Sequence, residues 1–461
     1  MLKQTIDKIL YACKGKVLQK GMQDWIQNIS IDSRKISPNS LFIPIIGEKF
    51  DGHDFIIEAR QMGAVAILCQ RGKNIPINDL EDIYIIEVEN TLTALQNISK
   101  KYRQCFNIPF LAVTGSTGKT STKDMISSVL NYKFNTLKNI GNLNNEIGLP
   151  LTILNLNNKH EIAVLEMGMS AIGEILDLTK IVKPHIAIIT NIGVSHISQL
   201  GNKENIAKAK MEIATYLGEK DFLLLNGEDK FLSKLRDTKT KYNKVFFGLN
   251  SNNDIYPKQI KDLGEGGFSI TIEKDGQEHL FRIKQPGIHN VYNVLPAIWV
   301  GLHNGMKPDE IKTALENHLP TEMRMEMINL DNIKLINDAY NASPDSMKAA
   351  LDVLKSIKGA RKIAVLGNMF ELGNFSYEGH YMVGNYAADK VDVLITVGDI
   401  AEAIADGATS FGMKNQIYKT MSNREASEIL IGLLRKDDLV LIKGSRGMTM
   451  EKIVDYLQER S

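Results

Sequence analysis

One stretch sets the architecture expected of the whole chain, Phe110-Leu111-Ala112-Val113-Thr114-Gly115-Ser116-Thr117-Gly118-Lys119-Thr120-Ser121. Its apolar start predicts a buried strand, its glycines predict a tight turn, and the apolar spacing that follows predicts a helix over residues 120–130. In this context glycines let backbone N–H groups close around phosphate oxygens, and a helix N-terminus adds the positive end of its dipole. The stretch is therefore predicted to be a phosphate-binding loop.

Within this loop, Lys119 would reach the outer phosphates of a nucleotide, and the hydroxyl of Thr120 would bind Mg²⁺. The motif is a shortened variant, because Val113 stands where the common pattern has its first glycine. An ordinary strand-to-helix turn with a solvated lysine is the alternative. The sequence Gly-x-x-Gly-Lys-Thr between a strand and a helix favours nucleotide binding.

Length and composition bound the kind of protein. The chain has 461 residues, enough for about three domains. The 55 Lys and Arg residues against 54 Asp and Glu give a net charge of +1, which predicts no nucleic-acid surface. No apolar run approaches the roughly 20 residues that span a bilayer, and the three widely spaced cysteines fit a reducing compartment. We expect a cytoplasmic monomer that binds neither nucleic acid nor membrane.

Short apolar runs alternate with helical segments along the chain, which predicts an α/β fold. We expect a small α/β domain over residues 1–107, a central domain over 108–320 with a mostly parallel sheet of the P-loop ATPase type, and a C-terminal Rossmann-like domain over 321–461. The strands expected in the second and third domains include residues 162–165, 186–189, 222–225, 333–336, 363–366, 393–397 and 439–442. A hairpin is expected around Lys274-Asp275-Gly276.

Two polar residues follow neighbouring strands of the expected central sheet. Glu166 ends one strand and His196 follows the next, and ligands of parallel sheets bind at such strand ends. Alone, Glu166 could cap the following helix and His196 could be a surface residue, but their shared position favours a Mg²⁺ site. Lys210 lies on a helix with Ile206 and Ile213, where a lysine that snorkels from an apolar stripe is an equally good interpretation.

Other polar segments allow two interpretations each. Asp32-Ser33-Arg34 and the segment 47–53 read first as turns, although Ser33 and Arg34 beside glycine-rich turns could hold a diphosphate. The asparagine-rich segment 139–150 reads as a loop that enters a helix. Asn290 and Asn293 could contact a base edge or cap a helix.

The ordered motifs resemble the Mur ligases of bacterial cell-wall synthesis along nearly the whole chain. The resemblance rests on Asp32-Ser33-Arg34, Asp51-Gly52-His53, Thr114 to Thr120, Gly141 to Gly148, Glu166-Met167-Gly168, His289-Asn290, Arg324, Asp338 to Ser346 and Lys443-Gly444-Ser445-Arg446. The segments Asn-Leu-Asn-Asn-Glu-Ile-Gly and Asp-Ala-Tyr-Asn-Ala-Ser-Pro-Asp-Ser are similar to the branch that adds D-alanyl-D-alanine. Two departures are Asn368, where the family usually has Asp, and Ser195 before His196, where Ala is more usual.

The resemblance implies ATP-dependent, ADP-forming amide ligation. The carboxylate of UDP-N-acetylmuramoyl-tripeptide would attack the γ-phosphate of ATP, and the amine of D-alanyl-D-alanine would attack the resulting acyl phosphate. Such a reaction brings two negative groups together, so cations must neutralise them. The third residue of the tripeptide stays open between diaminopimelate and lysine.

The resemblance also implies residue roles. The catalytic residues would be Lys119, Glu166, His196 and Lys210, with two Mg²⁺ ions held by Thr120, Glu166, His196 and a carbamylated Lys210. ATP would be bound by Gly115, Ser116, Thr117, Gly118, Lys119, Thr120, Ser121, Asn290, Asn293, Arg324 and Asp338. The substrates would be bound by Ser33, Arg34, Gly47, Asp51, Gly52, His53, Asn144, Asn145, Tyr340, Asn341, Ser343, Lys443, Ser445 and Arg446.

Three alternatives remain from the sequence. One is another ligase of the same superfamily, which adds a different amino acid or adds glutamate to folate. A second is a P-loop GTPase or ATPase switch, but we see no guanine-specifying motif, and the first and third domains would have no role. A third is a nucleotide-binding regulator without catalysis.

Overall fold

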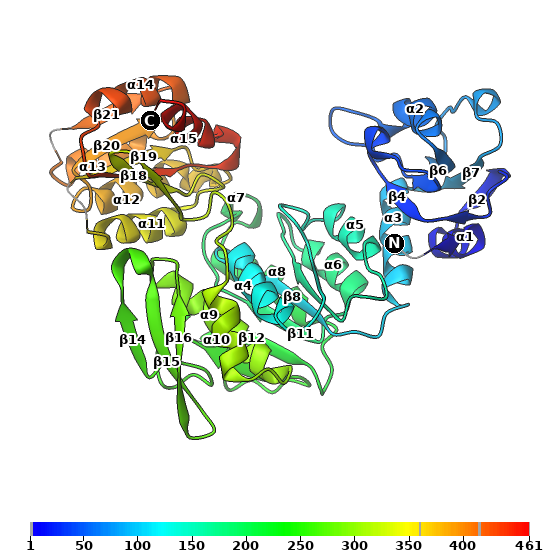
Figure 1. The fold of residues 1–461 in the computed structure, drawn as a ribbon. Coiled ribbons are helices and arrows are strands. Elements are labelled where there is room, and N and C mark those ends of the chain that lie inside the picture. Colours follow the sequence, from blue (N-terminus) through cyan, green and yellow to red (C-terminus); the bar gives the residue numbers. More distant parts are fainter. Residues whose placement is uncertain (1–2, 359–360, 414–415, 461) are drawn as a thin grey trace.

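The computed structural model describes residues 3–358, 361–413 and 416–460. These residues form an α/β protein, as predicted. The N-terminal part (residues 3–107), the central part (108–320) and the C-terminal part (321–460) each contain one of the larger sheets. Figure 1 shows the N-terminal part (blue) and the C-terminal part (yellow to red) on opposite sides of the central part. No helix among the described residues is long and apolar enough to cross a membrane.

The N-terminal part contains a five-stranded sheet with the order β2-β7-β6-β5-β4. Its strands are β2 (Lys16–Gln19), β4 (Asn28–Ser30), β5 (Ser40–Phe42), β6 (Ala64–Gln70) and β7 (Tyr84–Val88), and β1 (Gln4–Thr5) pairs with β3 (Trp25–Ile26). Its helices are α1 (Ile6–Cys13), α2 (Ile56–Gln61) and α3 (Thr91–Arg103). The side chain of Asn90 caps α3, whose apolar face is buried.

The central part is built on a six-stranded parallel sheet with the order β13-β12-β11-β8-β10-β9. Its strands are β8 (Phe110–Thr114), β9 (Thr136–Lys138), β10 (Ile162–Glu166), β11 (Ile186–Ile189), β12 (Phe222–Asn226) and β13 (Asn243–Phe247). The inner strands are apolar except at their carboxyl ends, where Thr114, Glu166 and Asn226 lie, because helices cover both faces of the sheet. Strands β10 and β11 flank β8, so their carboxyl ends meet at the phosphate-loop stretch.

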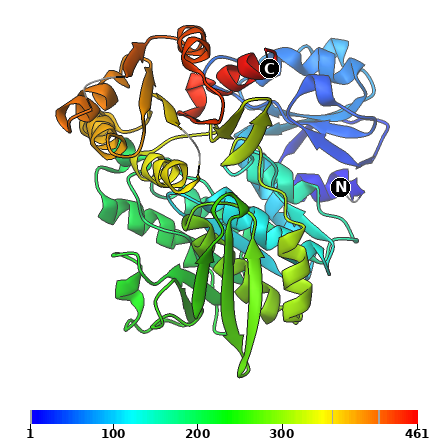
Figure 2. The same cartoon turned by 60° about the vertical axis from the view of Figure 1, so that its left-hand side comes forward.

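Seven helices and a smaller sheet complete the description of the central part. The helices are α4 (Lys119–Asn131), α5 (Gly148–Leu154), α6 (Glu174–Val182), α7 (Ile197–Leu200), α8 (Lys203–Met211), α9 (His289–His303) and α10 (Pro308–Glu316). The antiparallel strands β14 (Gln259–Asp262), β15 (Phe268–Lys274) and β16 (Gln277–Ile283) extend from it at the front of Figure 2. The predicted hairpin is confirmed, and Asp275 and Gly276 have the positive φ angles that a two-residue loop needs.

The C-terminal part contains a second six-stranded sheet with the order β17-β18-β22-β19-β20-β21. Strand β17 (Glu326–Leu330) is antiparallel to β18 (Ile333–Asn337), and the parallel strands are β18, β19 (Lys362–Gly367), β20 (Val393–Val397), β21 (Ile417–Thr420) and β22 (Asp438–Lys443). The helices α11 (Pro344–Ser356), α12 (Ser376–Ala387), α13 (Glu402–Ser410), α14 (Asn423–Leu433) and α15 (Glu451–Gln458) cover its faces. The domain boundaries after residues 107 and 320 stay a prediction.

Candidate functional site

A cavity of about 800 Å³ lies where the carboxyl ends of the central strands face the C-terminal part. Both parts line it, so residues distant in sequence come together there. The predicted residues that line the cavity are Ser116, Thr117, Gly118, Lys119, Thr120, Ser121, Asn144, Asn145, Glu166, His196, Lys210, Asn290, Asn293, Arg324, Asp338, Tyr340, Asn341, Ser343, Lys443, Ser445 and Arg446.

The phosphate-loop stretch has the backbone that its glycines predict. Gly115 and Gly118 have φ angles of +153° and +77°. A Cβ on Gly115 would lie 1.8 Å from Thr190 Oγ1, and one on Gly118 would lie 2.6 Å from Asn293 Oδ1. Helix α4 begins directly after Gly118 without a side-chain cap, which leaves its first N–H groups available to an anion.

Thr190 and Asn191, which directly follow strand β11, hold this loop by hydrogen bonds. Asn191 accepts a hydrogen bond from Thr117 N at 3.0 Å through its side chain, and its backbone carbonyl accepts one from Ser116 N at 3.0 Å. Thr190 Oγ1 donates to Thr117 O at 2.6 Å. The loop is therefore held in place by the residues that follow the strand next to β8.

Two lysines converge on the loop. The ammonium nitrogens of Lys119 and Lys210 lie 2.8 and 2.9 Å from the carbonyl oxygen of Gly115. Lys210 is only 1% exposed, so the snorkelling interpretation is wrong. Burial, followed by the charge of Lys119, holds the pKa of Lys210 well below its ordinary value. Burial also lowers the pKa of Lys119, although Glu166 opposes this effect.

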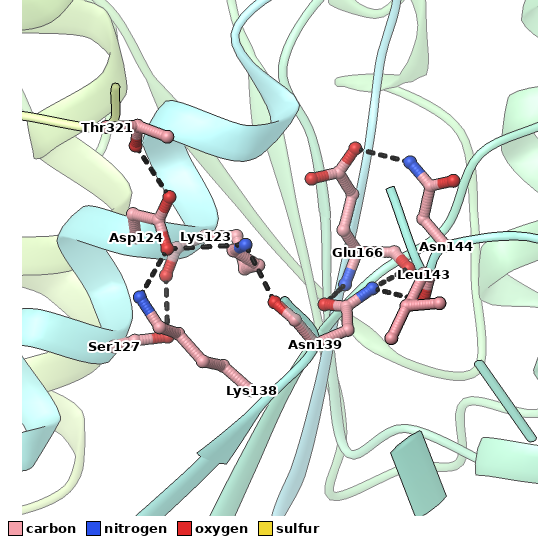
Figure 3. Close-up of polar contacts among 9 residues, drawn as sticks. All are labelled: Lys123, Asp124, Ser127, Lys138, Asn139, Leu143, Asn144, Glu166 and Thr321. Carbon is pink, nitrogen blue, oxygen red and sulfur yellow. Dashed lines mark hydrogen bonds and ion pairs between the residues drawn. The ribbon is translucent and has the colours of Figure 1, made fainter. Parts of the chain in front are cut away.

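Glu166 is buried at the end of β10 with one carboxylate oxygen free. Its Oε1 accepts a hydrogen bond from Asn144 Nδ2 at 2.8 Å, and its Oε2 has no partner among the described residues (Figure 3). It does not cap the next helix, because α6 begins at Glu174. A buried carboxylate oxygen without a partner beside a phosphate loop fits a divalent cation.

The described residues contain no cluster of three or more His, Cys, Asp or Glu that could hold a metal. This donor set fits Mg²⁺ better than a metal that needs a complete protein cage, since Mg²⁺ commonly binds one or two carboxylates together with substrate phosphates and water. Glu166 and the hydroxyl of Thr120 are the residues that would hold it.

His196 connects the central part to the C-terminal part. Its Nδ1 lies 2.7 Å from Oε2 of Glu371, which follows strand β19, and this contact is the largest cause of the lowered pKa of Glu371. The neighbouring Ile197 packs against the cores of both parts, and Ser198 N donates to Glu371 O at 3.4 Å. In Figure 1, α7 lies beside the C-terminal part. His196 is thus a contact residue between the two parts as well as a candidate ligand.

Asn290 and Asn293 do not cap helix α9, so that alternative is wrong. The residue before the helix is Ile288, which has no capping side chain. Asn290 Nδ2 donates to Pro286 O at 2.8 Å, and Asn293 Oδ1 accepts from Thr122 Oγ1 at 3.2 Å. Asn293 therefore ties α9 to α4 beside the phosphate loop, and contact of either residue with adenine stays a prediction.

The C-terminal wall of the cavity contains a buried ion pair and an arginine. Lys443 Nζ lies 2.5 Å from Asp338 Oδ2 and 2.9 Å from the carbonyl oxygen of Asn341. Burial lowers the pKa of Lys443, although Asp338 opposes this effect. Arg324 stacks over Tyr340 at 4.1 Å, and its buried Nε has no partner among the described residues. A guanidinium with an unused N–H group suits a phosphate oxygen.

Several polar residues of this wall have structural partners. Ser343 caps α11. Ser445 Oγ accepts a hydrogen bond from Phe370 N at 2.8 Å, and Arg446 contacts Glu451 at 2.8 Å. Asn368, the departure from the family pattern, accepts from Ala401 N at 2.7 Å and donates to Asp399 Oδ1 at 3.0 Å, and so holds the turn before α13. An amide serves this purpose here.

The predicted substrate residues of the N-terminal part, Ser33, Arg34, Gly47, Asp51, Gly52 and His53, do not line the cavity. Ser33 Oγ donates to Glu58 at 2.7 Å, and the exposed Arg34 pairs with Asp32. Both ring nitrogens of His53 are in use, one at 2.6 Å from Asp51 and the other accepting from Gln70 N. These contacts support the turn interpretation of both segments, and a role in binding UDP stays a prediction.

Comparisons with known proteins agree with this arrangement. Three family models match the chain: "Mur ligase family, catalytic domain" over residues 25–103, "Mur ligase middle domain" over 113–301, and "Mur ligase, glutamate ligase domain" over 323–446. A relative from Bacillus subtilis, UDP-N-acetylmuramoyl-tripeptide–D-alanyl-D-alanine ligase, is 40% identical over 463 residues, which cover 100% of this chain and 99% of the relative.

The chain belongs to the Mur ligase family. UDP-N-acetylmuramoyl-tripeptide–D-alanyl-D-alanine ligase from Escherichia coli is 31% identical over an alignment that covers 100% of this chain and 99% of the relative. Crystal structure I of MurF from Acinetobacter baumannii superposes with a TM-score of 0.91 at 30% identity, covering 99% of each chain. MurF ligase from Thermotoga maritima in complex with ADP has a TM-score of 0.82 at 28% identity, covering 94% of this chain and 97% of its own.

The sequence analysis of this Mur ligase missed residues that the structure brings to the site. Lys123, Asp124 and Asn139 are buried around Glu166 and helix α4, and Glu371 reaches His196. The i, i+4 spacing of Lys123 and Asp124 from Lys119 and Thr120 was a usable signal, because these pairs are neighbours on one helix face. No local signal marks Glu371, whose contact depends on how the two parts pack.

Proposed function

We propose that this chain joins D-alanyl-D-alanine to UDP-N-acetylmuramoyl-tripeptide at the expense of ATP, giving ADP and phosphate. The relatives that match the full chain carry this activity in their names. The observation that carries the proposal is the buried Oε2 of Glu166, which has no hydrogen-bond partner among the described residues, in a cavity shared by the phosphate loop and the C-terminal part. A phosphate site that faces a second binding wall suits the transfer of a phosphoryl group to another bound substrate.

In the proposed reaction the tripeptide carboxylate forms a bond to the γ-phosphorus, and the bond to the ADP oxygen breaks. The amine of the dipeptide then attacks the acyl carbon, phosphate leaves, and the nitrogen loses a proton. The N–H groups at the start of α4 bind and orient the phosphates. Lys119 and Arg324 bring positive charge to the two sides of the cavity, where the transferring group becomes more negative.

Mg²⁺, held by Thr120 and Glu166, would neutralise phosphate charge. A second ion would be bound near His196 and Lys210, provided that Lys210 is a carbamate. A neutral buried amine can attack CO₂ with loss of a proton, and the product is an anionic oxygen ligand that suits Mg²⁺. The burial of Lys210, its lowered pKa and its contact with Gly115 O rather than with a carboxylate support this step.

The remaining roles follow the family resemblance. Asn290 and Asn293 would bind adenine, and the N-terminal part would bind the UDP end through Ser33 and Arg34. Asn341, Ser343 and the segment 443–446 would bind the incoming dipeptide. The proposed domains remain 1–107, 108–320 and 321–461.

Phosphate release tests the proposed function. ATP and Mg²⁺ are offered with either the diaminopimelate or the lysine form of UDP-N-acetylmuramoyl-tripeptide, with and without D-alanyl-D-alanine. We expect release that requires both substrates. Release with a single amino acid in place of the dipeptide would favour another ligase of the superfamily. No release under any condition would favour a regulator.

Closure around the nucleotide is a separate expectation. Arg324 and Asp338 belong to the C-terminal part, but they are assigned to ATP that the central part binds. We therefore expect ATP analogue and tripeptide together to compact the protein and to exclude water from the acyl phosphate. Small-angle X-ray scattering with a non-hydrolysable analogue measures this as a smaller radius of gyration. If the free protein is open and its radius of gyration does not change when the analogue and the tripeptide are added, the predicted closure is wrong.

A further inference from the structure

Helix α4 carries two adjacent buried charges that the proposed reaction does not use. Lys123 and Asp124 are 2% and 7% exposed, and they follow Lys119 and Thr120 by one helical turn. Charged side chains are rarely buried unless their contacts compensate the lost hydration. The contacts of the two residues lead to opposite walls of the cavity.

The first contact leads to Glu166. Lys123 Nζ donates to the backbone oxygen of Asn139 at 3.0 Å. The side chain of Asn139 then binds both backbone groups of Glu166, accepting from its N at 2.9 Å and donating to its O at 3.0 Å (Figure 3). Asn139 thus fixes the end of strand β10 at the residue whose carboxylate enters the cavity.

Asn139 also holds the segment that carries Asn144, the hydrogen-bond partner of the Glu166 carboxylate. Its Nδ2 donates to Leu143 O at 2.9 Å, and the next residue, Asn144, donates to Glu166 Oε1 at 2.8 Å. One amide therefore holds the backbone of Glu166 and the segment that orients its side chain. Partners of a metal ligand commonly decide metal affinity in this way.

The second contact leads to the C-terminal wall. Asp124 Oδ2 accepts a hydrogen bond from Thr321 Oγ1 at 2.7 Å, while its Oδ1 lies 3.2 Å from Lys123 Nζ and 2.7 Å from Lys138 Nζ. Thr321 O in turn accepts from Arg324 N at 3.1 Å, closing a turn. The carboxylate therefore ties the segment that bears Arg324 to the phosphate-loop helix.

The charge of Asp124 is maintained in this setting. Burial acts to raise the pKa of Asp124, but Lys123, Lys138 and the hydroxyl of Thr321 outweigh it and keep the pKa below its ordinary value. Loss of the buried Lys123 would leave this carboxylate poorly compensated, whereas water can take the place of Lys138, whose side chain is 40% exposed.

We propose that Lys123 and Asp124 are positioning residues of the nucleotide site: Lys123 places Glu166 through Asn139, and Asp124 places Arg324 through Thr321. The inference rests on the proposed ATP chemistry, in which Glu166 and Arg324 face the phosphates. A cluster that only stabilised the fold would not separate magnesium binding from nucleotide binding.

The first arm is tested by Lys123→Met against Lys138→Met. Both variants remove a cation from Asp124, but only the first removes the contact with Asn139. ADP affinity is measured by calorimetry over a range of Mg²⁺ concentrations, and the Mg²⁺ needed for half-maximal phosphate release is measured in parallel. We expect Lys123→Met to need about 10- to 100-fold more Mg²⁺ in both assays, and Lys138→Met to stay within about threefold of the parent.

Asn139→Asp is the second variant of this arm, in case Lys123→Met does not fold. It keeps the acceptor for Glu166 N and loses both donors. It is expected to show the same increase in the Mg²⁺ requirement. An unchanged requirement in a folded Lys123→Met or Asn139→Asp protein, or equal effects of the two lysine variants, would overturn the first arm.

The second arm is tested by Thr321→Val against Thr321→Ser. Valine removes the hydroxyl that Asp124 accepts from, whereas serine keeps it. We expect Thr321→Val to raise the KM for ATP about tenfold without a change in the Mg²⁺ requirement, and Thr321→Ser to remain near the parent value. Equal losses in both variants would overturn this arm. A parent protein that releases no phosphate with both substrates would instead contradict the proposed function.

Discussion

Lys119→Ala is expected to lower the rate of phosphate release by a factor on the order of 10²–10³, the loss typical of one positioned electrostatic group. The Lys119 amine donates a hydrogen bond to Gly115 O beside the N-terminus of α4. The residue is partly buried and lines the cavity. It is the positive group of the phosphate loop itself. Without it, only the backbone N–H groups and the metal would bind the outer phosphates. The rate is measured at saturating ATP, Mg²⁺ and both substrates.

Lys133→Ala is a suitable control for this experiment. Lys133 lies just beyond the other end of α4, is exposed, and donates to Gly305 O. Circular dichroism and thermal unfolding should show that both variants keep the fold. A folded Lys119→Ala protein with near-normal turnover would mean that the loop does not bind the transferred phosphate.

Elements buried on both sides were predictable from the sequence. Strands β8, β11 and β20 are buried along their whole length and are apolar apart from Thr114 and Thr396, because helices cover both faces of their sheets, so each appears as a short, nearly continuous apolar run. Helix α3 carries local signals of the same kind, since Asn90 caps its start and its buried apolar residues recur at helical spacing.

Elements at sheet edges were not predictable in the same way. Strands β4, β9 and β17 lie at edges of their sheets, and their residues alternate little or are polar. What makes them strands is a neighbour that supplies hydrogen bonds, as β10 does for Thr136–Lys138. A local pattern does not contain that neighbour.

The site was predictable where topology alone groups residues. The carboxyl ends of parallel strands share one edge, so Glu166 and the phosphate loop had to meet there. Pairings across the chain were a different matter. Asp338 and Lys443 were assigned different partners, but they contact each other across 105 residues. Whether Lys210 is exposed or buried likewise depends on what packs against α8.

The second large effect is expected at Lys210. As an ammonium group it would repel Mg²⁺, and its site supplies no carboxylate to compensate it, only Gly115 O among the described residues. As a carbamate it would be an anionic oxygen ligand. Lys210→Ala is therefore expected to lose most of its activity. Small carboxylates such as acetate should partly restore the rate by filling the vacated ligand position.

Lys208→Ala is the matched control, because Lys208 lies two residues away on the same helix but is exposed. It should retain parental activity and show no response to acetate. Labelled ¹³CO₂ gives a readout independent of turnover: a carbamate carbon signal is expected in the parent and in Lys208→Ala, and none assigned to this site in Lys210→Ala. Full activity of Lys210→Ala would contradict the proposal that Lys210 is a carbamate. A crystal equilibrated with CO₂ that shows an unmodified amine paired with a carboxylate would do the same, because such a pair would keep the lysine protonated and leave it no role as a metal ligand.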